Sequence, residues 1–315
     1  CGILCSSTCP AFPLSPPSSP NTYMQHLPAP PPAPIWTSGP ILRAVQMSDI
    51  FADGKHFVDS PLRVSPAEAL GRWSSLPKLP GTGQPARADL RAFVNATFGD
   101  PGHELLHWQP PDFNATPPLL AMLPAGSVRS WASQLHAMWG VLGRQVSPSV
   151  ESAPGRTTLL PAAHGFVIPG GRFREAYYWD SYWIVLGLLA VGMHHTACSL
   201  TRNLLDAVRA YGFVPNGLRT YYLGRSQPPL LTQMVAAVID GGEAPLVAAA
   251  QSSNPAASPV DACQHEGVST ELLLEALPLL DRECTDPSTE LVGCSYYLAI
   301  SPPPLPHLPY ACRHR

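Results

Sequence analysis

The sequence predicts an all-α protein whose two ends differ from its middle. Between about residues 41 and 240, apolar side chains recur at steps of three and four, and strict apolar/polar alternation is almost absent. Proline makes up 39 of the 315 residues, more than twice the usual ~5%, and it is concentrated near the ends. We therefore expect a disordered proline-rich segment at 1–40, a helical domain at 41–240 and a divergent, largely irregular tail at 241–315.

The first helices are predicted between residues 41 and 98. Residues 41–51 have a helical apolar pattern. A second helix begins at Ser65, because serine is a good N-cap, Pro66 fits the first helical position and Glu68 completes a capping box. Residues 87–98 form the third predicted helix.

The helix predicted at residues 127–143 has the most regular pattern in the chain. Its apolar side chains follow at steps of three and four, which makes one stripe along a helix. The stripe consists of Val128, Trp131, Leu135, Met138 and Leu142. Further helices are predicted at residues 181–193, at 197–211 before Gly212, at 230–239 and, interrupted by Pro278, at 270–280.

Composition excludes several classes of protein. Charged residues make up 13% of the chain, about half the ~25% of ordinary soluble domains, and the net charge is −3. A strongly basic nucleic-acid-binding protein is therefore excluded, and we expect no nucleic-acid partner. The longest apolar run, residues 183–193, is shorter than the ~18–20 residues that span a bilayer, so we expect no transmembrane segment.

No cofactor or metal site is predicted. Gly170 and Gly171 lack the following Lys-Ser/Thr of a phosphate-binding loop. The spacing of His194, His195 and Cys198 on a helix is compatible with metal ligands, but no second group of ligands lies nearby in the sequence. We favour the interpretation that these three residues line a helix end.

Residues 169–182 concentrate the side chains that can carry chemistry. They read Pro-Gly-Gly-Arg-Phe-Arg-Glu-Ala-Tyr-Tyr-Trp-Asp-Ser-Tyr, with two carboxylates, Glu175 and Asp180, among several aromatic rings. Aromatic faces stack on sugars, while arginine and aspartate fix hydroxyl groups. A carbohydrate site is one interpretation. A buried aromatic cluster with a structural Arg–Asp pair is the other, and the residues alone leave both open.

This segment resembles the first signature of the trehalase family of glycoside hydrolases at all of its fixed positions. Residues 45–62, 211–217 and 221–229 are also similar to segments of the family, animal trehalases above all, so the resemblance covers about residues 41–240. It implies part of an (α/α)6 toroid and inverting hydrolysis of α,α-trehalose to two glucoses. The positions that match substrate-binding residues of the family are Arg172, Trp179, Asp180, Asn216, Arg225, Ser226 and Gln227.

Other parts of the family pattern do not occur in this sequence. The second signature, Gln-Trp-Asp-x-Pro, is absent, as are the Arg-Pro-Glu segment and the stretches that carry the catalytic acid and base. Glu175 and Asp180 are poor substitutes, because five residues of helix rotate ~140° and turn the two carboxylates apart. We therefore assign no catalytic residue and expect this chain to be inactive on its own. The alternatives are a non-enzymatic sugar-binding remnant and an interaction protein acting through its proline-rich ends, including residues 28–34.

Three further expectations follow. The sequons at Asn95 and Asn114 are candidate glycosylation sites, Asn114 the better one because prolines flank it. The resemblance implies a secreted or cell-surface protein, although neither a signal peptide nor the hydrophobic tail of a lipid-anchor signal is found in this chain. Since only seven or eight of the family's twelve core helices are predicted, the apolar stripes of helices 127–143 and 197–211 should be partly uncovered.

Overall fold

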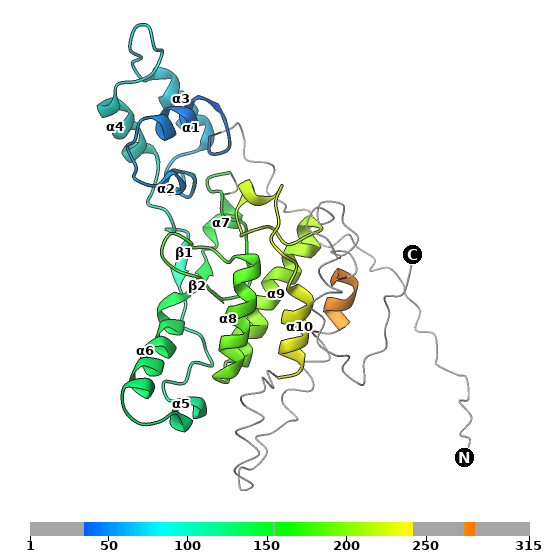
Figure 1. Ribbon diagram of the computed structural model, residues 1–315. Helices are drawn as coiled ribbons and strands as arrows, with labels where there is room; N and C mark the ends of the chain where they lie inside the picture. The colour runs from blue at the N-terminus through cyan, green and yellow to red at the C-terminus, as the bar shows by residue number, and fades with distance from the viewer. Residues whose placement is uncertain (1–34, 154, 242–271, 273, 281–315) are drawn as a thin grey trace, which may run out of the picture.

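The computed structural model describes residues 35–153, 155–241, 272 and 274–280, and its described part is rich in helix (Figure 1). This confirms the predicted helical class. The segment 28–34 and most of the tail beyond Gly241 lie outside the described residues. The toroid stays a prediction.

Four short helices build an N-terminal unit, residues 35–98, at the top of Figure 1. They are α1 (Gly39–Met47), α2 (Gly54–Val58), α3 (Pro66–Ser75) and α4 (Arg87–Thr97). The predicted cap of α3 is confirmed, since the Ser65 side chain accepts a hydrogen bond from the Glu68 amide at 3.2 Å. The unit has its own apolar core, in which the rings of Trp36, Phe57, Trp73, Phe93 and Phe98 pack edge to face.

The N-terminal unit includes residues that precede the expected start of the helical domain at residue 41. Ile35 and Trp36 are 1% and 2% exposed, and the Trp36 indole donates to the Ser60 carbonyl oxygen at 3.0 Å. These two large apolar side chains contribute to the core of the N-terminal unit despite the prolines on both sides. Proline content marked the neighbourhood as irregular, but it did not show that Ile35 and Trp36 anchor it.

A small antiparallel sheet, which was not predicted, joins the N-terminal unit to the later helices. Its strands are β1 (Leu105–His107), β2 (Gly143–Val146) and β3 (Phe166–Val167), in that order. Leu105 pairs with Val146, and Gly143 pairs with Val167. Strands of two to four residues are too short to show apolar/polar alternation, so the expectation of an all-helical chain missed them.

The main core is formed by α8 (Tyr178–Ala190), α9 (His194–Tyr211) and α10 (Leu231–Ile239), which contact one another, while α9 also covers β3. Gly212, with φ at 91°, ends α9 in the left-handed conformation that the sequence predicted. Helical residues 272 and 274–280 join the same core through Leu272, Ala276 and Leu279. Pro278 lies within this helix.

Between β1 and β3 the chain forms α5 (Pro118–Met122), α6 (Ser127–Leu142) and α7 (Ser149–Ser152). In Figure 1, α6 projects away from the α8–α9–α10 group. Its predicted apolar stripe is partly uncovered, as expected: Val128, Trp131, Leu135 and Met138 are exposed, whereas Leu142 packs against the main core. Among the helices that the structure describes, none is long and apolar enough to cross a membrane.

For α9 the same expectation is wrong. Eleven of its residues are buried, because α8, α10, β3 and helix 274–280 surround it. Uncovered apolar surface is therefore a property of α6 and not of every predicted helix.

Candidate functional site

The signature loop, residues 169–182, begins with a tight turn that presents Arg172. Gly170 and Gly171 have φ values of 100° and 61°, which glycine adopts without strain. Gly170 and Phe173 pair through backbone hydrogen bonds, so Arg172 lies at the tip of the turn. The loop then enters α8, whose first turn carries Trp179 and Asp180.

Residues 213–229, the return segment, lie against the signature loop. The Tyr178 amide donates to the Asn216 carbonyl at 3.2 Å, and the Leu218 amide donates to the Ala176 carbonyl at 3.0 Å. A side chain at Gly217 would meet the Tyr177 ring at 3.1 Å, so glycine permits this close approach. The fold thus brings together two groups of predicted site residues that are about 40 positions apart.

Three of the predicted residues keep their polar groups unused. Asn216 is 5% exposed, Asp180 is half-buried and Arg225 is exposed. Within the part of the chain that the structure describes, the side chains of these three residues make no hydrogen bond or ion pair. Such groups are suited to bind an external ligand that carries hydroxyl groups.

Ser226 and Gln227 have roles inside the protein. The Ser226 hydroxyl donates to the Val214 carbonyl at 2.7 Å, so its proton is used within the return segment. The Gln227 side-chain oxygen accepts from the Trp179 amide at 3.1 Å, at the start of α8. Both residues therefore hold the site together, and Gln227 fixes the helix turn that carries Trp179.

The aromatic side chains of the site are unusually open. Trp179 and Phe173 are each 44% exposed, although large aromatic rings are normally well buried. The Arg172 guanidinium is 5.7 Å from the Phe173 ring centroid, and the Phe173 and Tyr177 rings meet edge to face. Exposed ring faces beside unused polar groups match the pattern of a carbohydrate site.

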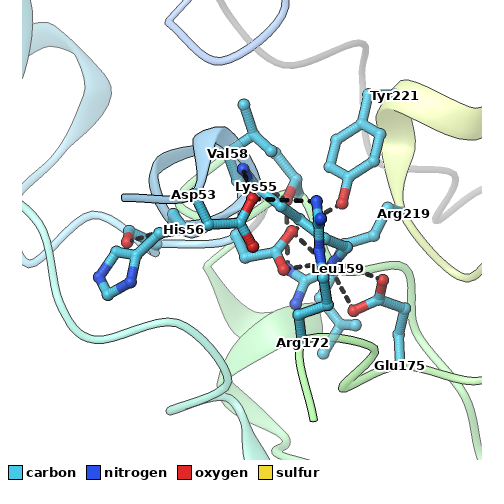
Figure 2. Close-up of polar contacts among 12 residues, drawn as sticks. Asp53, Lys55, His56, Val58, Leu159, Arg172, Glu175, Arg219 and Tyr221 are labelled. Carbon is cyan, nitrogen blue, oxygen red and sulfur yellow. Dashed lines mark hydrogen bonds and ion pairs between the residues drawn. The ribbon is translucent and has the colours of Figure 1, made fainter. Parts of the chain in front are cut away.

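Glu175, by contrast, belongs to a buried ionic cluster, which consists of Lys55, Asp59, Glu104, Glu175 and Arg219. Figure 2 labels three of its members, Lys55, Glu175 and Arg219. Its carboxylate lies 2.7 Å from the Lys55 ammonium and 3.2 Å from the Arg219 guanidinium, and it accepts a hydrogen bond from Tyr177. Glu175 and Arg219 are both 0% exposed. Burial alone would raise the pKa of Glu175, but Arg219 and Lys55 outweigh burial and hold that pKa below its ordinary value.

The other members of the cluster are joined by further ion pairs and hydrogen bonds. Asp59 accepts from Tyr221 at 2.6 Å and pairs with Lys55 one helical turn earlier. Arg219 also lies 3.4 Å from Glu104, whose carboxylate accepts from Thr157. Burial opposes the charge of Arg219, yet the three carboxylates Glu175, Asp59 and Glu104 raise its pKa.

The cluster decides the chemistry available to Glu175. A carboxylate that is ionised, fully buried and bonded to two cations has no access to water or substrate, so Glu175 is not a general acid or base. The sequence analysis missed the role of Lys55, Glu104 and Arg219. The spacing of Lys55 and Asp59 by four residues was the one local signal, since it places opposite charges on one helix face.

A separate pocket of about 460 Å³ opens between the N-terminal unit and α7. No predicted substrate-binding residue lines it, and its walls include Leu62, Leu106 and Val150 beside the exposed cations Arg63 and Arg156. It lacks aromatic rings for stacking on a sugar. The candidate site is therefore the surface formed by the signature loop and the return segment.

The two sequons differ in their surroundings. Asn114 is exposed, and the Thr116 amide donates to its side-chain oxygen at 3.0 Å in an open turn. Asn95 lies in α4, and its partner Thr97 is 0% exposed. As for metals, no group of three or more His, Cys, Asp or Glu side chains gathers in a suitable arrangement among the residues described.

Comparisons with known proteins identify relatives of this chain. The family model described as Trehalase matches residues 49–254. The chain is 44% identical to the trehalase of Homo sapiens over 209 residues, which is 66% of this chain and 36% of that protein. It is 35% identical to the trehalase of Dictyostelium discoideum over 265 residues, 82% of this chain and 41% of that protein.

A solved structure, the neutral trehalase Nth1 from Saccharomyces cerevisiae, matches over 40% of this chain and 21% of its own, with 31% identity. The TM-score of 0.30 is too low to bear on how the helices are arranged. The chain spans little more than a third of the length of the curated relatives it matches.

Proposed function

The chain belongs to the trehalase family, and we propose from this premise that its signature loop and return segment bind one glucose unit of trehalose. The activity proposed for the family site is inverting hydrolysis of α,α-trehalose to two glucoses. The chain covers only 36% of the human relative, so the hydrolytic activity of a whole trehalase is itself proposed here and not established.

One observation carries the proposal. Backbone hydrogen bonds join the signature loop to the return segment, the polar side-chain groups of Asp180, Asn216 and Arg225 are unused, and the Trp179 ring is 44% exposed. Binding a sugar would satisfy these groups and cover the ring. In this proposal Arg172 supplies further donors, while Ser226 and Gln227 act mainly by holding the loops.

The carboxylates explain why we propose no turnover by this chain alone. An inverting glycosidase needs two carboxyl groups ~6.5–9.5 Å apart across the bond, one as acid and one as base. Glu175 is withdrawn into the buried ionic cluster, which leaves Asp180 as the carboxylate of the signature loop that a sugar can reach. One carboxylate does not supply both roles, so this chain should bind the sugar without cleaving it.

The experiment is a calorimetric titration of the purified chain with trehalose and with glucose, beside an assay of glucose release. We expect millimolar binding, because half a pocket leaves much of the ligand in water. Arg172→Ala should abolish binding, whereas Arg91→Ala, which removes an exposed arginine from α4, should not. Absence of binding to either sugar would refute the proposal.

Glucose release separates the two enzymatic interpretations. No release above background would support a sugar-binding chain without its own catalysis. Turnover that Asp180→Asn abolishes without lowering the stability of the chain would show that a catalytic carboxylate lies in the signature loop after all.

We also propose that the protein is secreted or displayed at the cell surface, which rests on its family, and that Asn114 carries the glycan. Asn114 is exposed in an open turn, while Thr97 in the other sequon is buried within its helix region. Expression through a secretory pathway should give one endoglycosidase-sensitive mass shift. Asn114→Gln should remove that shift, and its persistence would point to Asn95 instead.

A further inference from the structure

The helix α2, which sequence reasoning did not connect with the site, contacts the signature loop at two points. Asp53 lies 2.9 Å from the Arg172 guanidinium, and Lys55 lies 2.7 Å from the Glu175 carboxylate. Figure 2 shows Asp53, just before this short helix, and Lys55 within it, together with Arg172 and Glu175 of the signature loop. One contact is half-exposed and the other is buried.

Asp53 is held in place before it meets Arg172. It is the N-cap of α2, and its Oδ1 atom accepts a hydrogen bond from the Lys55 amide at 3.0 Å. The same oxygen is the one closest to Arg172 Nη2. Because the cap fixes the aspartate rotamer, the carboxylate forms a preorganised partner for the guanidinium.

Arg172 needs such a partner. It lies at the tip of a turn between Gly171 and Phe173, and its side chain is 53% exposed. A free arginine side chain samples many rotamers, and binding a sugar would have to restrict them. Apart from the ion pair with Asp53, Arg172 contacts the Phe173 ring of the signature loop.

From this geometry we propose that Asp53 is a positioning residue for substrate binding, which holds the Arg172 guanidinium in the orientation that meets the sugar. The idea rests on the proposed function, because it assigns Arg172 to the sugar. Lys55 anchors the other end of the same loop in the buried ionic cluster. Residues 53–59 thereby connect the N-terminal unit to the site.

The variant that tests this is Asp53→Asn. Asparagine caps helices as well as aspartate does, so α2 keeps its cap while the charge on Arg172 is lost. The pair is partly exposed, and we therefore expect trehalose to bind about two- to fivefold more weakly.

Salt supplies a readout that a purely structural role would not change. Trehalose carries no charge, so salt affects its affinity here through ion pairs of the protein. Wild-type affinity should fall toward that of Asp53→Asn between low and ~0.5 M NaCl, while the affinity of the variant should stay constant. Glu68→Gln removes a matched surface carboxylate, paired with Arg72 at 2.7 Å far from the site, and should behave like wild type.

A measurement without ligand separates this inference from the proposed function. The Nε–Hε signal of Arg172, assigned through Arg172→Lys, should report a restricted side chain in wild type and a more mobile one in Asp53→Asn. If wild type binds no trehalose, the proposed function fails and this signal alone decides whether Asp53 restricts Arg172. Unchanged affinity together with an unchanged Arg172 signal would overturn the proposal, as would a lower stability of Asp53→Asn without either change.

Discussion

The helices α6 and α9 share helical apolar periodicity but have opposite surroundings. Both carry regular apolar patterns, but α9 buries eleven of its residues while α6 buries only His136 and Gly140. Most members of the apolar stripe of α6 are exposed, among them Trp131 at 62% and Leu135 at 49%. Periodicity therefore predicts that a helix forms, whereas burial depends on which other elements reach that helix.

The reason lies in the neighbours of each helix. Around α9, the helices α8 and α10 and strand β3 supply apolar surface on several sides. The inward side of α6 includes Gly140, whose carbonyl lies 3.0 Å from the His107 ring, and His136, which stacks on Phe113. Trp139 and Leu142 pack against the main core from the same helix, while most of the predicted apolar stripe stays exposed.

The contrast between buried and exposed surroundings also applies to charged residues. The largest expected effect on stability is in the buried ionic cluster. Glu175→Gln should lower the free energy of unfolding by about 3–5 kcal/mol, since it leaves Lys55 and Arg219 buried with less compensation. The exposed Glu68–Arg72 pair is the control, and Glu68→Gln should cost only about 0.3–0.5 kcal/mol. Urea unfolding followed by circular dichroism measures both.

The pH dependence gives an independent check on Glu175. Its pKa is lower in the folded protein than the ordinary value of 4.5, so it contributes stability above that pH. This contribution is lost as the pH falls below about 4.5 toward the folded pKa. Wild type should therefore lose stability more steeply than Glu175→Gln in acid, and parallel curves would argue against an ionised Glu175.

A smaller effect compares the two helices directly. Leu200→Ala in α9 removes a side chain that is 0% exposed and should destabilise the protein by about 2–5 kcal/mol. Leu135→Ala in α6 changes a half-exposed side chain to a better helix former, so its effect should stay within about 0.5 kcal/mol. Equal losses at the two positions would mean that the apolar stripe of α6 is covered in solution.

The smallest effect on stability is expected for polar substitutions in the apolar stripe of α6, although they should change the association of the protein. Exposed apolar patches favour association, so the wild-type chain should self-associate and express poorly in soluble form. Trp131→Gln together with Leu135→Glu should reduce association in sedimentation velocity and leave the unfolding free energy nearly unchanged. A wild-type protein that is already a monodisperse monomer would contradict this prediction.

Much of the local structure was determined by the sequence alone. The caps and apolar periods predicted α3, α4, α6, α9 and α10 close to their observed limits, because a helix depends on contacts between residues three and four apart. The signature loop and return segment were also identified from their residues, and backbone hydrogen bonds join them in the folded protein. Short elements such as α2 and the sheet escaped prediction, since a few residues do not establish a period.

Only the tertiary structure decided which side chains are available to a ligand. Glu175 and Asp180 are both carboxylates of one short motif. Only Glu175 is paired with buried cations, Lys55, 120 positions earlier, and Arg219, 44 positions later. Asp53 likewise meets Arg172 only because α2 folds back onto the signature loop. Local sequence fixes the period of an element and the chemistry of its side chains, but charge compensation and burial depend on partners that distant parts of the chain deliver.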